Sequence, residues 1–456
     1  MARPAKQMQL NLFENASLGT NTAIGQWKTP GDTSRTKDRL DYWRWLARLA
    51  EKGKFTSIFG GANIGAMDPL VIVPVMAAET ESLSFGITAS TSYIAPYALA
   101  RTYSTLDHMT NGRIGWNIVT SHSTSAAQAF GKDEVVPHDE RYAAADEYMD
   151  IVYSLWEKSW EDGAIRWQNE PEMAFDPSKI HNISYEGKYH RMNGTHQTHP
   201  SPQRTPLLFQ AGASKAGIAF ASKHAEGIFF TAPTLEAAKK FSSSIRSKAA
   251  EDGRDPYSIK LFLGIMPIIG RTEEEAQAKL ESFRAQVSVQ GGLARFGNFS
   301  TVDLSGVPLD EEFKFEGAHY ANSIQGVVNN IKLISEQGKF TPRIAGELYA
   351  FGGSNPRPVG TPEQIADFFE KWWREADIDG FNVNYISSPS SMEDLVELLV
   401  PELQRRGIYR KEYPVPGGTA RENMYGEKGH NLLGPQHFGA SFRWPEPTET
   451  IASDQA

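Results

Sequence analysis

The sequence predicts an α/β protein whose strands and helices alternate and close into a (β/α)8 TIM barrel with insertions. Short apolar segments bounded by turn residues alternate with longer segments of helical periodicity. The alternation occurs eight times, which is the number of units that closes such a barrel. A doubly wound open sheet is the alternative, but no G-x-G-x-x-G motif follows the first predicted strand.

The predicted strands are short apolar runs that end at turn residues. The first, at residues 8–13, alternates apolar and polar side chains, the pattern of a strand with one buried face. The other seven follow at residues 55–59, 83–90, 114–119, 206–210, 227–231, 259–269 and 380–386.

The predicted helices carry start and stop signals. Asp68-Pro69 and Thr361-Pro362 place a capping side chain directly before a proline in the first turn. Gly53 and the pair Asn111-Gly112 follow helix ends, where left-handed backbone is common. We predict helices at residues 38–52, 71–80, 97–109, 139–156, 214–224, 234–250, 272–286, 361–376 and 392–406.

Three segments interrupt the alternation in what we predict to be a single barrel domain over residues 1–456. Residues 157–206 are rich in Pro, His, Asn and aromatic residues, which predicts an inserted hairpin with loops. Residues 287–358 form an insertion of Gly-rich and Pro-rich pieces around one helix near residues 323–337. Residues 410–456 are a Pro- and Gly-rich C-terminal tail.

Composition excludes several classes of protein. The 456 residues include no cysteine, so disulfides, thiolate metal ligands and cysteine nucleophiles are excluded. A net charge of −9 and a pI near 5.7 disfavour a nucleic-acid surface. No apolar stretch approaches the roughly 20 residues of a membrane span, and residues 1–30 lack the apolar run of a secretory signal. We expect a soluble, cytoplasmic protein that binds neither nucleic acid nor membranes.

Two strand-to-helix turns concentrate small and polar residues. After the predicted strand at 114–119 comes a polar turn at residues 120–123, and residues 137–142 then enter a helix. The second turn, residues 210–217 (QAGASKAG), places Ser214 at a helix N-terminus, where free amides and the helix dipole favour an anion. The alternative is that Ser214 only caps its helix and Gly212 only makes a tight turn.

Several motifs in one order resemble a known family. They are residues 51–55 (EKGKF), 101–113 (RTYSTLDHMTNGR), 116–121 (WNIVTS), 138–142 (HDERY), 201–204 (SPQR), 210–214 (QAGAS) and 379–381 (DGF). Together they resemble the bacterial-luciferase-like flavin monooxygenases, within them the group that oxidises nitrilotriacetate, EDTA and dibenzothiophene sulfone. The resemblance implies a barrel that binds reduced FMN, which a separate NAD(P)H:flavin reductase supplies, and that oxidises a small sulfur- or amine-containing compound with O2. It also implies a homodimer or homotetramer.

The resemblance also implies roles for particular residues. Ser214 and the amide of Ala213 would hold the FMN phosphate. Tyr142 and His138, four residues apart on one helix face, would donate to the phosphate and to the ribityl chain or ring edge. His138 is our candidate catalytic residue, as a donor at the flavin rather than an obligatory proton shuttle. Its alternative role is to cap a solvated loop.

Two further residues complete the predicted flavin site. Asn117, on the strand at 114–119, would meet the ring or ribityl edge, unless it is a buried amide satisfied by neighbouring strands. Ser92 takes the position of a small hydroxyl near the flavin in the family, although Thr91 could fill the same place, and Ser121 is a weaker candidate. We expect no metal, because His181, His190, His196 and His199 have neither a shared helix nor an acidic cluster.

One segment departs from the family. Members carry a longer loop after the second strand, usually beginning with an Ala-Asp pair, whereas here Phe59 runs through residues 60–65 almost directly into Asp68-Pro69. Two alternatives stay open. One is other flavin chemistry on the same barrel, such as a lyase or a deazaflavin-dependent dehydrogenase; the other, which the short loop motivates, is a catalytically impaired barrel with a binding role. A flavin-independent hydrolase is disfavoured, because no Ser-His-Asp triad or carboxylate pair can be assigned.

Overall fold

The eight predicted strands form a closed parallel barrel, so the predicted fold class is confirmed. The computed structural model describes residues 6–19, 21–61, 66–300, 302–304, 306–312 and 340–444. In spatial order the strands are β1 (Gln9–Asn15), β2 (Ser57–Gly61), β3 (Ser84–Ser90), β4 (Ile114–Val119), β9 (Leu207–Gln210), β10 (Gly227–Phe230), β11 (Lys260–Ile265) and β14 (Gly380–Val383), which pairs again with β1.

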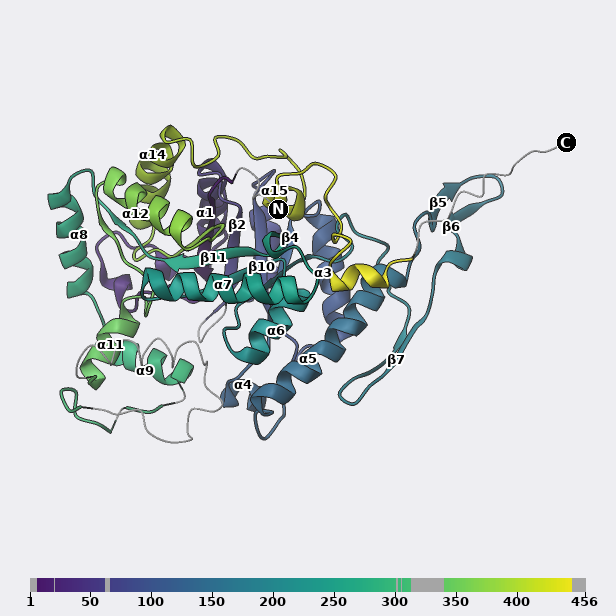
Figure 1. Ribbon diagram of the computed structural model, residues 1–456, viewed down its shortest axis with the longest axis horizontal. Coiled ribbons are helices and arrows are strands. Elements are labelled where there is room, and N and C mark those ends of the chain that lie inside the picture. The colour runs from purple at the N-terminus through teal and green to yellow at the C-terminus, as the bar shows by residue number, and fades with distance from the viewer. Residues whose placement is uncertain are drawn as a thin grey trace.

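The helices surround the barrel (Figure 1). They are α1 (Leu40–Lys52), α2 (Pro69–Ala77), α3 (Pro96–Met109), α4 (Thr124–Ala129), α5 (His138–Tyr153), α6 (Lys215–His224), α7 (Leu235–Glu251), α8 (Glu273–Ala285), α9 (Val289–Ser300), α11 (Pro342–Ala350), α12 (Pro362–Glu375), α13 (Ser390–Asp394), α14 (Val400–Arg405) and α15 (Ala420–Tyr425). The predicted capping signals act as expected, since the side chains of Asp68 and Thr361 accept amide hydrogens of α2 and α12. No described helix is long and apolar enough to cross a membrane.

The structure corrects several predicted elements. The sequence predicts none of the helices α4, α9, α11 and α15. The predicted strand at 259–269 divides into β11 and the separate β12 (Ile268–Ile269), which pairs with β13 (Val359–Gly360). The last predicted helix consists of α13, a π-helical turn and α14 in succession. The helix predicted near residues 323–337 lies outside the described residues.

The segment 157–206 contains two hairpins, where the sequence predicts one. They are β5 (Ile165–Gln168) with β6 (Met173–Phe175), and β7 (Ile183–Glu186) with β8 (Arg191–Gly194). Both extend from one side of the barrel in Figure 1. Each hairpin forms a two-stranded sheet of its own, so both are appendages of the barrel rather than parts of its sheet.

The barrel interior is filled by side chains. Phe59 packs edge-on against Phe209 and Phe229, with ring centroids 4.7 and 4.0 Å apart. One layer nearer the amino ends of the strands, the Ser57 hydroxyl donates to Asn11 Oδ1 over 2.6 Å. Because the interior is a packed core and not a channel, small ligands must bind at one of its ends. We call the end formed by the carboxyl ends of the strands the mouth.

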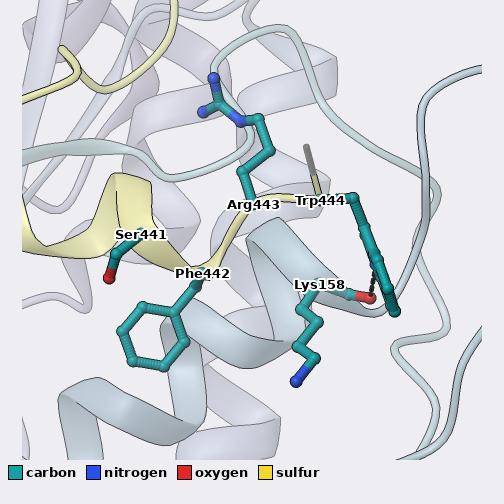
Figure 2. Close-up of a pocket in the computed structure, with 5 residues that line it drawn as sticks. All are labelled: Lys158, Ser441, Phe442, Arg443 and Trp444. Atoms are coloured by element: carbon teal, nitrogen blue, oxygen red, sulfur yellow. Dashed lines mark hydrogen bonds between the residues drawn. The ribbon is translucent and has the colours of Figure 1, made fainter. Parts of the chain in front are cut away.

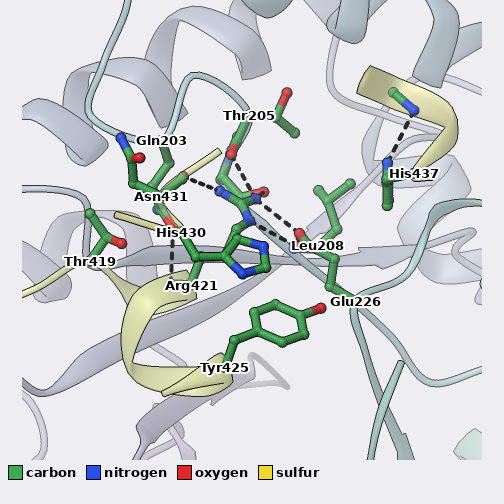
Figure 3. Close-up of polar contacts among 12 residues, drawn as sticks. Gln203, Thr205, Leu208, Glu226, Thr419, Arg421, Tyr425, His430, Asn431 and His437 are labelled. Carbon is green, nitrogen blue, oxygen red and sulfur yellow. Dashed lines mark hydrogen bonds and ion pairs between the residues drawn. The ribbon is translucent and has the colours of Figure 1, made fainter. Parts of the chain in front are cut away.

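The opposite end of the barrel is closed by the C-terminal segment, which the sequence predicts only as a tail. Ala420 and Met424 of α15 pack against the phenylalanines of the interior. Gln9, at the start of β1, donates to the Met424 carbonyl over 2.8 Å. The buried guanidinium of Arg421 bonds to Glu226 and to the Thr205 carbonyl, which precede β10 and β9 (Figure 3). Residues 410–444 are therefore an integral part of the barrel.

Candidate active site

The strongest candidate site lies at the mouth, where the β9–α6 turn meets α5. The Ser214 hydroxyl caps α6 by accepting the Gly217 amide hydrogen over 3.0 Å. The Gly212 amide donates to Gln210 Oε1 over 2.6 Å. Helix α6 has no acidic residue in its first turn, so the positive end of its dipole is not neutralised locally.

Two glycines let the Tyr142 hydroxyl of α5 approach this turn. A Cβ atom on Gly212 would lie 2.8 Å from that hydroxyl, and one on Gly217 would lie 2.9 Å from it and 3.1 Å from Ser214 Oγ. Burial raises the pKa of the Tyr142 hydroxyl, although hydrogen bonding with Ser214 and Thr120 partly offsets the shift. At neutral pH the hydroxyl is therefore a protonated donor beside the α6 N-terminus.

His138 begins α5 next to Tyr142, as the spacing predicts. The two rings lie edge to face with centroids 5.2 Å apart. His138 Nδ1 hydrogen-bonds to Asp139 Oδ1 over 2.7 Å, which leaves Nε2 for another partner. The structure thus gathers Ser214, Tyr142 and His138 at one place, and the amide of the exposed Ala213 adjoins them.

Asn117 lies on β4, and Ser92 lies in the turn that follows the neighbouring strand β3. Asn117 Nδ2 donates to the Thr88 hydroxyl over 3.0 Å, and its buried Oδ1 has no hydrogen-bond partner among the described residues. The Ser92 amide donates to Ser90 Oγ over 3.1 Å, and Ser90 in turn accepts from the Ser121 hydroxyl over 2.8 Å. Asn117 Oδ1 is therefore a free acceptor, and Ser92 and Ser121 both donate hydrogen bonds to the Ser90 hydroxyl.

Thr91, the alternative to Ser92, is hydrogen-bonded to strand β4. Its amide and its hydroxyl both donate to the Val119 carbonyl, over 3.0 and 3.3 Å, and the residue is buried. Ser92 is only half-buried. Of the two hydroxyls, that of Ser92 is the better placed to meet a ligand at the mouth.

Sequence reasoning passed over Arg141, although it belongs to the 138–142 motif. The residue is 4% exposed, and its Nη1 donates to the Val136 carbonyl over 2.6 Å. Its buried Nε has no hydrogen-bond partner, and no carboxylate within the described part of the chain forms an ion pair with it. A buried cation without a counter-ion is costly, so Arg141 adds to the preference of this region for an anion.

The histidines of the hairpin segment are engaged separately. Nε2 of His181 bonds to Glu161 over 2.7 Å, that of His190 to the Ala144 carbonyl over 3.1 Å, and that of His196 to Ser104 Oγ over 3.0 Å. Within the described ranges, no three or more His, Asp or Glu side chains gather in a way that could hold a metal ion.

A surface pocket of about 300 Å³ lies away from the mouth, where the C-terminal segment crosses the end of α5 (Figure 2). Arg443 there is bound to the buried Glu157 over 2.7 Å, and the Trp444 indole donates to the Lys158 carbonyl over 2.7 Å. These contacts fasten the C-terminal segment to the barrel. The pocket does not adjoin the residues predicted to bind flavin.

The residues at the mouth fit a phosphorylated cofactor. Gly212 and Gly217 let the Tyr142 hydroxyl approach the N-terminus of α6, a helix of ten residues. Among the described residues, Asn117 Oδ1 has no hydrogen-bond partner. A parallel (β/α)8 barrel with an anion cradle at the carboxyl ends of its strands is the architecture of a cofactor-dependent enzyme. Residues 18–380 match the sequence profile described as luciferase-like monooxygenase, and the chain belongs to this family of flavin-dependent monooxygenases.

Individual relatives span nearly the whole chain. The chain is 40% identical over 460 residues to the long-chain alkane monooxygenase of Geobacillus thermodenitrificans, covering 96% of this chain and 98% of the relative. It is 33% identical to nitrilotriacetate monooxygenase component A of Aminobacter aminovorans, covering 92% and 96%. A crystal structure of riboflavin lyase with modified FMN and riboflavin superposes with a TM-score of 0.85 at 31% identity, covering 96% and 100%. The predicted family and group are confirmed.

Proposed function

We propose that the protein is the oxygenase component of a two-component monooxygenase. It binds FMNH2 supplied by a separate NAD(P)H:flavin reductase and oxidises a small organic substrate that contains sulfur or an amine. Bound FMNH2 supplies the two electrons with which O2 gives one oxygen atom to the substrate and one to water. The observation that supports this proposal best is the cradle of Ser214, Gly217 and Tyr142 at the α6 N-terminus. The family resemblance further suggests a cytoplasmic homodimer or homotetramer.

Each proposed residue has one task in cofactor binding. The Ser214 hydroxyl, the Ala213 amide and the protonated Tyr142 hydroxyl hold the FMN phosphate at the positive end of α6. His138 donates through Nε2 to the ribityl chain or ring edge, since its Nδ1 is engaged by Asp139. Asn117 presents its free Oδ1 to a flavin N–H, and Ser92 lines the same end of β3.

The phenylalanines below the mouth exclude water from the floor of the site. Phe59, Phe209 and Phe229 are all at most 8% exposed and pack against one another. A floor that admits no water favours transfer of oxygen to the substrate over loss of hydrogen peroxide. The loop after Phe59, where the sequence departs from the family, includes residues 62–65, which lie outside the described residues.

Titration of the anaerobic protein with FMNH2 tests the proposal. We expect micromolar binding, and a delayed return of oxidised-flavin absorbance after mixing with oxygen. His138→Ala and Ser214→Ala should each weaken binding by about tenfold, because each removes one hydrogen bond to a charged or polar group of the cofactor. Absence of binding in the wild type would contradict the proposal and favour a barrel with a binding role. Unchanged affinity in both variants would remove these two assignments.

A lyase-type flavin reaction is the second candidate, because the chain resembles riboflavin lyase over its whole length. Both reactions use the same cradle, so flavin affinity does not separate them. Product analysis with thioether, amine and flavin substrates does. Oxygenated sulfur or amine products favour the monooxygenase, whereas cleavage of riboflavin itself favours the lyase.

A further inference from the structure

Helix α9 lies across the mouth. At one side, Arg295 Nη1 donates to the Thr22 and Asn21 carbonyls over 2.6 and 3.3 Å. At the other, His122 Nε2, just after β4, donates to the Asn298 carbonyl over 3.3 Å. Figure 1 places α9 and α11 at the end of the molecule opposite α15. The helix therefore covers the barrel end at which the flavin cradle lies.

The guanidinium of Arg295 is held above the end of β1. Asn21, whose carbonyl it contacts, donates through Nδ2 to the carbonyl of Phe13 in β1 over 3.2 Å. Thr22 supplies the second carbonyl, and its side-chain hydroxyl donates to the sulfur of Met266, which follows β11, over 3.6 Å. Strand β9, which carries the flavin cradle, is four strands from β1 in either direction around the barrel. Arg295 and the phosphate cradle therefore lie on opposite sides of the mouth.

No carboxylate of the described residues pairs with Arg295. Its Nη1 bonds only to the two carbonyls, and Nε and Nη2 have no hydrogen-bond partner in the described part of the chain. Burial lowers its pKa to about 10, so it remains a cation at neutral pH. Arg113 also lacks a carboxylate, but four hydrogen bonds to oxygen atoms occupy its Nε, Nη1 and Nη2. In Arg295, by contrast, the Nε–Nη2 edge of the guanidinium has no hydrogen-bond partner among the described residues.

Two acidic groups on the β1 side of the mouth are already engaged. Glu14, at the end of β1, is bound to Lys37 and accepts hydrogen bonds from the hydroxyls of Tyr42 and Tyr385 over 2.8 and 2.7 Å. Asp32 accepts from the Ser387 hydroxyl and other donors. Arg295 and Arg141 are therefore two guanidiniums near the mouth that have no carboxylate partner among the described residues, although the chain as a whole has a net charge of −9.

We infer that Arg295 binds an anionic group of the substrate, so that the substrate is an organic anion, a sulfide or amine that bears a carboxylate. The free Nε–Nη2 edge of a guanidinium matches a carboxylate with two parallel hydrogen bonds. A position across the mouth from the phosphate cradle places that carboxylate away from the cofactor phosphate. This inference rests on the proposed monooxygenase function and adds the substrate class to it.

Thiodiglycolate and its dimethyl ester test the inference, because they share a thioether and the ester replaces both carboxylates by uncharged methyl ester groups. We expect the KM of the dianion to be at least tenfold below that of the ester. Arg295→Met should raise the KM of the dianion by about ten- to a hundredfold and leave that of the ester unchanged. Arg295→Lys should retain part of the preference. The control is Arg343→Met, since Arg343 is exposed and paired with Asp310, and it should behave as the wild type.

Two titrations separate this inference from the proposed function. One is a calorimetric titration with thiodiglycolate, with and without FMN, and the other is a titration with FMNH2. Normal FMNH2 binding by Arg295→Met together with lost thiodiglycolate binding supports both. Three outcomes with normal FMNH2 binding would show that the anionic substrate class is wrong while the cofactor assignment stands. They are a preference for the ester, an Arg295→Met variant that matches the wild type, and no binding of either thiodiglycolate or its ester. Absence of FMNH2 binding overturns the proposed function, and the titration without FMN still reports on Arg295.

Discussion

Arg421→Met is expected to destabilise the protein by about 3–5 kcal/mol, the cost of leaving a buried charge without its partner. Arg421 is fully buried, and its Nε and Nη2 bond to the two carboxylate oxygens of Glu226 over 2.7 and 2.9 Å. Nη1 donates to the Asn431 carbonyl over 2.6 Å. Figure 3 shows the guanidinium surrounded by these acceptors. Methionine fills similar space but supplies none of the donors, so Glu226 would stay buried and unpaired.

The loss of unfolding free energy in Arg421→Met should depend on pH. Burial is the largest single influence and raises the pKa of Glu226, but the charge and hydrogen bonds of Arg421, with smaller contributions from His437 and the Leu208 amide, together hold that pKa below its usual range. A carboxyl with a lowered folded-state pKa stabilises the wild type above the unfolded pKa of about 4.3, and that stabilisation is lost as pH falls through the folded pKa. Without Arg421, burial should raise the pKa of Glu226, which then protonates more readily. The difference between variant and wild type should therefore be largest near pH 7 and shrink below about pH 4.

Urea unfolding followed by tryptophan fluorescence, at pH 7 and at pH 4, measures this difference. Arg374→Met is the control, because Arg374 forms an exposed pair with Glu370 on α12 and should cost less than about 1 kcal/mol. Combining Arg421→Met with Glu226→Gln should recover part of the loss, since no charge is left buried. A free energy of unfolding for Arg421→Met within 1 kcal/mol of the wild type would contradict the assigned role.

The barrel was predictable because its signals are local. Each strand is an apolar run that ends at turn residues, and Asp68 and Thr361 mark helix starts within a few residues of sequence. Helix α4, with the sequence TSAAQA, has no apolar periodicity, so nothing distinguishes it from the polar turn before it. The role of α15 depends on contacts such as that of Arg421 with Glu226, 195 residues apart. A segment rich in proline and glycine gives no indication of such a partner.

The candidate site likewise contains residues that the sequence could place and one that it could not. Ser214, Gly212 and Tyr142 belong to short motifs at strand ends, so their proximity follows once the strands are known to be parallel. Arg295 lies in an insertion for which the sequence predicts no role. Its position over β1 depends on carbonyls some 270 residues earlier in the chain, at Asn21 and Thr22. Only the folded arrangement reveals that the guanidinium lacks an acidic partner.

Ser214→Asp is expected to weaken FMNH2 binding at least a hundredfold without unfolding the protein. Asp is as good an N-cap as Ser, so its carboxylate should still accept the Gly217 amide that Ser214 accepts now. It also favours the positive end of α6. The same carboxylate would face the FMN phosphate, and two like charges about 4 Å apart repel by about 4 kcal/mol at an effective dielectric constant of about 20. A hundredfold loss requires only about 2.7 kcal/mol.

Ser214→Asn and reduced riboflavin make this prediction specific to the phosphate. Asn has the shape of Asp without its charge and also caps helices well, so Ser214→Asn should bind FMNH2 within about tenfold of the wild type. Reduced riboflavin lacks the phosphate, and its affinity should be the same for Ser214→Asp and Ser214→Asn. If Ser214→Asp binds FMNH2 as tightly as Ser214→Asn does, the phosphate does not lie at the α6 N-terminus. If both flavins lose affinity equally, the carboxylate acts on the ring or the fold, and the cradle of Ser214 and Tyr142 has another ligand.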